Sequence, residues 1–98
     1  MSELDMTVDD HIRLGRRLYE LDVALAEQWV RFRKVPGYTN DLAPMITGLN
    51  AVRAGLDGQF FADHAGSYAE SVYYPGSVSS TQVRADVRKA QRTDEEAA

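Results

Sequence analysis

Residues 7–34 read TVDDHIRLGRRLYELDVALAEQWVRFRK, and apolar side chains recur in them every three to four residues. This spacing returns to the same side of an α-helix after each turn. Thr7 and Asp10 have the separation of an N-terminal capping box, while Pro36 and Gly37 follow the basic end of the stretch. The sequence therefore predicts one long helix over residues 7–34. Trp29 adds a large ring near the carboxyl end. The main apolar row of this helix consists of Leu14, Leu18, Leu21, Leu25 and Phe32.

A second apolar row lies beside the first on the same predicted helix. It contains Ile12, Tyr19, Val23, Ala26 and Val30. Together the two rows form an apolar face wider than one neighbouring helix covers. We therefore expect either a third helix or a second copy of the chain to pack on this face.

Small residues mark the next predicted helix, which begins near residues 41–44 and places Pro44 in its first turn. Interior glycines disfavour a long helix, because each costs about 1 kcal/mol relative to alanine. The spacing of the small residues nevertheless passes through Gly58 without a change of phase, so a continuous helix over residues 42–72 is predicted. Beside the small residues lies a row of bulkier side chains, which are Leu42, Met45, Leu49, Val52 and Leu56. The small residues that share one side of this helix are Gly48, Ala51, Gly55, Gly58, Ala62, Ala65 and Ala69.

This stripe of small residues has two interpretations. It forms the inner face of a hairpin with the first helix, or it is an interface with a second copy or another protein. The first interpretation is favoured because the neighbouring helix is tethered and present at high effective concentration. In either case the stripe lets another helix approach closely.

The last part of the chain is shorter and more polar. The segment Tyr73-Tyr74-Pro75-Gly76-Ser77 ends the hairpin, and Ser79 with Gln82 has the spacing of a capping box for a helix over residues 81–92. The acidic residues 93–98 are expected to fray. The predicted fold is thus all-α, a long antiparallel helical hairpin (residues 1–78) with a short C-terminal helix and acidic tail (residues 79–98), completed by oligomerisation or by a partner.

Composition limits the class of protein. The 98 residues are 44% hydrophobic and 27% charged, which is typical of a globular chain rather than a disordered one. Cysteine is absent, so neither a disulfide nor a thiolate metal site is expected. No apolar run is long enough to span a membrane, and the acidic first ten residues do not resemble a secretory signal. The expected location is the cytoplasm, without membrane contact.

Candidate site residues are few. His11 and His64 would lie at the same end of an antiparallel hairpin, but no helix carries a metal-ligand spacing, so we expect solvated or capping histidines and no metal or cofactor. Aromatic residues concentrate in residues 60–74 and suit either a partner surface or the open end of a bundle. Of these, Tyr73 and Tyr74 are expected to be the exposed ones.

The sequence therefore predicts a non-enzymatic structural or adaptor protein that acts by helix-mediated self-association or by binding a larger protein assembly, such as a viral or other large particle. The alternative is a small nucleic-acid-associated transcriptional regulator that uses the arginines of the first and last helices; the net charge of −4 disfavours it. The predicted interface residues are Leu14, Leu18, Leu21, Leu25, Trp29, Phe32, Gly48, Ala51, Gly55, Ala62, Tyr73 and Tyr74.

Overall fold

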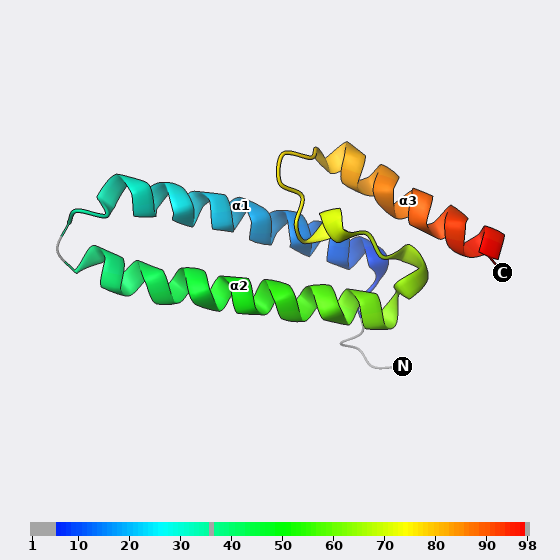
Figure 1. Ribbon diagram of the computed structural model, residues 1–98, viewed down its shortest axis with the longest axis horizontal. Helices are drawn as coiled ribbons and strands as arrows, with labels where there is room; N and C mark the ends of the chain where they lie inside the picture. Colours follow the sequence, from blue (N-terminus) through cyan, green and yellow to red (C-terminus); the bar gives the residue numbers. More distant parts are fainter. Residues whose placement is uncertain (1–5, 36, 98) are drawn as a thin grey trace.

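A computed structural model describes residues 6–35 and 37–97. Over these ranges the chain is helical and contains no strand, as predicted. Helices α1 and α2 lie side by side as an antiparallel hairpin, and α3 lies beside the end that holds the start of α1 (Figure 1). None of the described helices is long and apolar enough to cross a membrane. The elements are α1 (Val8–Phe32), α2 (Tyr38–Asp63), the short 3-10 helices η1 (Ala65–Ser67) and η2 (Glu70–Val72), and α3 (Ser80–Ala97).

The start of α1 has the predicted capping box. The hydroxyl of Thr7 accepts a hydrogen bond from the backbone N–H of Asp10 at 3.0 Å, and the Asp10 carboxylate accepts one from the backbone N–H of Thr7 at 2.9 Å. These bonds satisfy two donors that the first turn of a helix leaves free. At the other end α1 stops at Phe32, two residues before the predicted limit. Pro36 lies outside the described residues, and Gly37 has the positive φ of 82° that glycine adopts at low cost.

Helix α2 is displaced along the chain relative to the prediction. It begins at Tyr38, so Pro44 lies inside the helix and not in its first turn. It passes through Gly58 but ends at Asp63, which contradicts the continuous helix over residues 42–72. His64 leaves the helical conformation there, with φ −138° and ψ 49°. Beyond it Gly66 lies against α3, where a Cβ atom would come within 2.5 Å of Asp94 Oδ2.

The stripe of small residues does not form the inner face of the hairpin. Leu42, Leu49 and Phe60 are the apolar α2 residues that become buried. Burying bulky side chains removes more apolar surface from water than burying small ones, and the free energy gained scales with that area. A Cβ atom at any of the three glycines Gly48, Gly55 and Gly58 would have nothing within 4 Å. The favoured interpretation of the stripe is therefore wrong, since these residues and Ala51 and Ala62 face away from α1.

The hydrophobic core sits at one end of the molecule. It is formed where the first half of α1 meets the second half of α2, the η1–η2 segment and α3 (Figure 1). The rest of the hairpin, which we call the arm (residues 21–35 and 37–52), lies beyond this core and consists of α1, α2 and the turn between them. The radius of gyration is accordingly 16.1 Å, against about 13 Å for a compact chain of this length. The buried members of the core are Ile12, Phe60, Val72, Tyr73, Val83 and Val87.

Helix α3 is longer than predicted. It extends from Ser80 to Ala97, so the acidic residues 93–97 are helical rather than frayed. The Ser79 hydroxyl accepts the backbone N–H of Gln82 at 3.1 Å, as a capping box requires. The Gln82 side chain instead donates to Asp86 at 2.9 Å and does not return to the cap. Val83 and Val87 anchor this helix in the same core as α1 and α2.

Candidate functional site

The second apolar row of α1 is covered over only part of its length. Ile12 belongs to the hydrophobic core and is only 8% exposed. Farther along, Val23, Ala26 and Val30 are exposed, with Val30 at 64%. The expected third helix is therefore present, but it covers the row at the core end and leaves the arm uncovered.

The uncovered row borders a groove between the two helices of the arm. Ala26 and Trp29 of α1 line a hollow of about 360 Å³ together with Ala43, Ile46 and Thr47 of α2. A neighbouring hollow extends along α1 past Val23, Ala26 and Val30. We call these two hollows the arm groove. Ala26 lines both and so marks its centre.

The opposite side of the arm is also apolar. Leu21 is 48% exposed, Met45 57% and Val52 54%. Met45 and Val52 are seven residues apart and thus share one side of α2. In a helix with 3.6 residues per turn, Met45 points away from Ala43, and Leu21 away from Val23. The arm therefore presents aliphatic side chains on both of its sides.

The predicted interface residues are distributed over several environments. Leu14, Leu18, Leu25 and Phe32 are half-buried, whereas Leu21 and Trp29 are more exposed. Tyr74 is 42% exposed, as expected. Tyr73 is fully buried, which contradicts its expected exposure, because the segment between η2 and α3 carries it into the core. The exposed small residues of the set, on the back of α2, are Gly48, Ala51, Gly55 and Ala62.

Tyr73 belongs to a buried cluster of rings. His11 Nδ1 lies 2.5 Å from the Tyr73 hydroxyl, and the His11 ring stacks on Phe60 with centroids 4.8 Å apart. His64 lies edge-on at 5.7 Å, so the two histidines occupy the same end of the hairpin, as predicted. His11 is fully buried and its Nε2 has no hydrogen-bond partner among the described residues, so the expectation of a solvated or capping histidine is wrong for His11. His64 Nε2 donates to the Met6 carbonyl at 2.7 Å.

Burial perturbs the acid–base behaviour of this cluster. Desolvation lowers the pKa of His11, and the nearby His64 lowers it further, while Asp63 and Asp10 act in the opposite direction. Burial also raises the pKa of Tyr73 to about 12, so its hydroxyl stays protonated at physiological pH. Within the described ranges, no group of three histidine or acidic side chains is arranged to hold a metal ion. The cluster is accordingly a buried polar contact that joins α1 to the segment after η2.

We expect stability to fall as the pH drops below about 6.5, the ordinary pKa of histidine. His11 binds its proton less readily in the folded than in the unfolded chain, so acid favours unfolding, by up to about 1.4 kcal/mol per pH unit. Urea unfolding between pH 5 and 7 measures this slope. The double variant His11→Phe/Tyr73→Phe removes both polar partners and is expected to flatten it. An unchanged slope in that variant would assign the pH dependence to other groups.

Arg53 fixes the same segment from α2. It is only 7% exposed, and its Nε donates to the Tyr73 carbonyl at 2.6 Å. Its Nη1 forms an ion pair with Asp22 of α1 at 3.2 Å, and its guanidinium lies 4.8 Å from the Tyr74 ring centroid. Sequence reasoning missed this residue, although Arg53 follows Leu49 by four residues and precedes Leu56 by three, and so visibly interrupts the apolar side that those two share.

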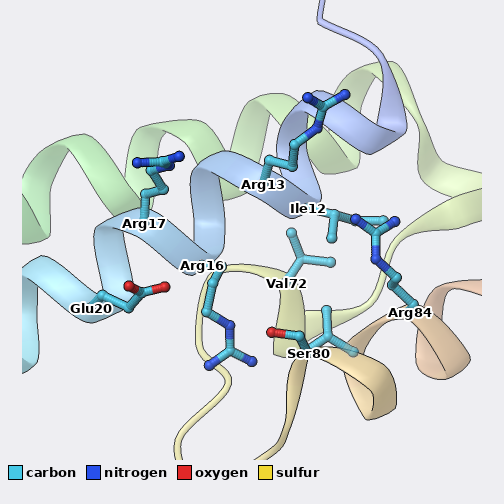
Figure 2. Close-up of a pocket in the computed structure, with 9 residues that line it drawn as sticks. Ile12, Arg13, Arg16, Arg17, Glu20, Val72, Ser80 and Arg84 are labelled. Carbon is cyan, nitrogen blue, oxygen red and sulfur yellow. The ribbon is translucent and has the colours of Figure 1, made fainter.

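A third hollow, of about 360 Å³, lies at the core end between α1 and α3. Figure 2 shows that Arg13 and Arg17 extend from α1 away from Val72, whereas Arg16 extends from the other edge of the helix and Arg84 approaches from α3. We call it the arginine hollow. Its lining residues are Ile12, Arg13, Arg16, Arg17, Glu20, Val72, Ser80, Val83 and Arg84.

Asp9 links the two helices at the edge of the arginine hollow. Its carboxylate accepts from Arg84 of α3 at 3.0 Å and pairs with Arg13 of its own helix. The hydrogen bond from Arg84 lowers the pKa of Asp9 most, and the hydrogen bond from Arg13 lowers it further. Arg16 donates to the Val78 carbonyl at 3.0 Å and so holds the loop before α3.

Comparison with known proteins gives no family for this chain. No protein-family model, curated protein or solved structure matches it significantly.

Proposed function

We propose that this chain is a non-enzymatic structural or adaptor protein that acts by self-association through its arm. The observation that carries this proposal is the interrupted second row of α1, which is covered at Ile12 and open at Val23, Ala26 and Val30. Because the rest of the molecule covers only part of this apolar row, a partner that buries the exposed part would lower the free energy by removing apolar surface from water.

A second copy of the chain is the occupant that this surface suits. Two-fold association places the same patch of each protomer against the other, so the patch has to be self-complementary. The lining of the arm groove combines the small side chains of Ala26 and Ala43 with the larger, exposed side chains of Trp29 and Val30, so two copies can offer each other both kinds. Two arms packed through this side would form a four-helix bundle, an arrangement that buries such rows. The protein would then serve as a scaffold, or as a subunit of a larger assembly.

The matched pair Ala26→Glu and Ala24→Glu tests this proposal. Both alanines are exposed on α1, but Ala24 lines neither hollow of the arm groove. We expect sedimentation equilibrium to give about twice 10.9 kDa for the natural chain and for Ala24→Glu at high micromolar concentration. Ala26→Glu places a charge in the groove, and we expect it to be monomeric.

Circular dichroism of each variant serves as the control for folding, because both substitutions replace an exposed residue. A natural chain that stays monomeric over this range, or equal masses for the two variants, would contradict self-association through the arm groove.

The alternative, a nucleic-acid-associated regulator, receives less support. Arg84 of the last helix does join Arg13, Arg16 and Arg17 of the first. The remaining bases of α3, Arg88, Lys89 and Arg92, do not line that hollow, so the last helix adds only Arg84 to the arginines of the first helix there.

A further inference from the structure

The cover over the second apolar row of α1 lies on the same side of the helix as the arm groove. Ile12 is buried in the core, and Arg16, one turn farther along, donates to the Val78 carbonyl of the loop before α3 at 3.0 Å. Ile12 and Val30 are eighteen residues apart, which is five full helical turns, so both point in the same direction. On this side α3 lies beside the start of α1 and leaves the rest of α1 open (Figure 1). The cover therefore stops before Val23, which is exposed.

This cover determines in which direction a second copy can lie along the open row. Two-fold symmetry allows the two α1 helices to run either parallel or antiparallel. In a parallel dimer the η2–α3 segments of the two copies would lie at the same end and on the facing sides, so they would meet before the arms touched. In an antiparallel dimer these segments lie at opposite ends. Each arm can then continue the layer that the partner's own η2–α3 segment begins.

The charges of the arm favour the same direction. Asp22 and Glu27 line the arm groove on the side of the core, whereas Arg31 lines it on the side of the turn, where the exposed Arg33 and Lys34 follow. Parallel α1 helices would place acids beside acids and bases beside bases. Antiparallel helices place the acidic part of each α1 beside the basic part of the other, which lowers the electrostatic energy of the pair. Within the part of the chain that the structure describes, Glu27, Arg31 and Lys34 form no ion pair of their own.

Side-chain size fits the antiparallel direction as well. The α1 part of the arm, residues 21–35, is centred on Gln28. Complete overlap of two antiparallel arms therefore places Ala26 of one copy beside Val30 of the other, since both lie two residues from the centre. Alternation of small and large side chains across facing positions lets two helices pack closely. A parallel dimer would instead place the larger Val30 against its own copy.

We propose that two copies pack arm to arm with their α1 helices antiparallel, so that the two core ends lie at opposite ends of the dimer. This inference rests on the proposed function, self-association through the arm. Each copy is 57 Å long and the arms overlap over about 22 Å, so the dimer is a rod about 90 Å long. Both ends of the rod present the same α3 surface, and the dimer is thus suited to link two identical partners.

Introduced cysteines test the direction, because the natural chain has none. Val23→Cys lies at the core end of the arm and Lys34→Cys near its turn, and both positions are exposed. The two variants, one of them carrying a mass tag, are mixed and treated with a short bis-maleimide. We expect the main product to join one variant to the other. Cross-links that form within each variant, and not between them, would mean parallel arms and would overturn the proposal.

Ala24→Cys is the matched control for Val23→Cys. Ala24 is exposed at the next position but lines neither hollow of the arm groove. We expect it to give much less cross-linked product with Lys34→Cys. Equal yields from Ala24→Cys and Val23→Cys would indicate random collisions and would contradict the arrangement.

Charge reversal tests the pairing between the two α1 helices. Glu27→Arg and Arg31→Glu should each weaken the dimer by about fivefold, because each places like charges side by side at two symmetry-related contacts. The double variant Glu27→Arg/Arg31→Glu restores opposite charges and should recover the natural dissociation constant within about twofold. Circular dichroism confirms that each variant is folded. A double variant weaker than both single variants would contradict the antiparallel direction.

Sedimentation equilibrium and small-angle X-ray scattering of the natural chain separate this inference from the proposed function. A chain that stays monomeric contradicts self-association and the antiparallel arrangement together. A dimer with a maximum dimension of about 90 Å supports both. A dimer little longer than the 57 Å of one copy would retain self-association and overturn the antiparallel arrangement alone.

Discussion

Phe60→Ala is expected to lower the free energy of unfolding by about 3–5 kcal/mol. Phe60 is completely buried at the centre of the core and contacts the rings of His11, Tyr68 and Tyr73. Its removal leaves a cavity shared by three segments of the chain, which cannot all close on it together. Chemical denaturation of the natural chain and of the variant measures the difference.

Phe61→Ala is the matched control, because it removes the same side chain from the next position. Phe61 is 59% exposed and packs edge-on against Tyr68 at 5.2 Å. We expect a loss of less than about 1.5 kcal/mol there, the upper range for an aromatic pair. Similar losses at both positions would show that the core is not built around Phe60.

Gly15→Ala is expected to destabilise the fold by about 2 kcal/mol or more, although alanine is the better helix former. Gly15 is the buried position where α1 meets η2 most closely, and a Cβ atom there would collide with the Val72 carbonyl and lie 2.8 Å from its carbon. A backbone group cannot rotate away as a flexible side chain can, so η2 would have to leave α1. Thermal unfolding should show a melting temperature lower by roughly 10 °C.

Gly55→Ala is the matched control, and we expect it to raise the stability of the fold rather than lower it. A Cβ atom at Gly55 has open space around it, so the variant gains the helix preference of alanine, about 1 kcal/mol, without a collision. Its melting temperature is therefore expected to rise. A rise at both positions would mean that α1 and η2 do not approach as described.

Local signals were sufficient to predict the elements whose ends are set by nearby residues. The start of α1 depends on Thr7 and Asp10, three residues apart, and the structure has both of the predicted bonds. The end of α2 depends instead on distant packing. The predicted stripe continues through Ala65 and Ala69, yet α2 ends at Asp63, and the absence of a side chain at Gly66 allows Asp94 of α3 to approach. No local pattern distinguishes such a glycine from one inside a helix.

The candidate sites were predictable to a similar extent. The width of the apolar face on α1 indicated that a third helix or a second copy of the chain would pack there; the structure has the third helix, but the sequence did not indicate where its cover would stop. The burial of Tyr73 was not predicted, because it depends on contacts with His11 and Arg53, which lie 62 and 20 residues away in sequence. Likewise, Arg84 joins the arginines of α1 only because α3 returns beside that helix. Contacts between distant segments, rather than local spacing, determine both sites.

The placement of the core at one end gives the hairpin a gradient of local stability. Amide groups near Phe60 and Ile12 are protected by three packed segments, so their hydrogens exchange with solvent only through large-scale unfolding. Those near Val30 and Met45 belong to two helices with few buried neighbours and open by fraying from the turn. Association at the arm would therefore slow exchange at the weaker end and leave the end that is already protected unchanged.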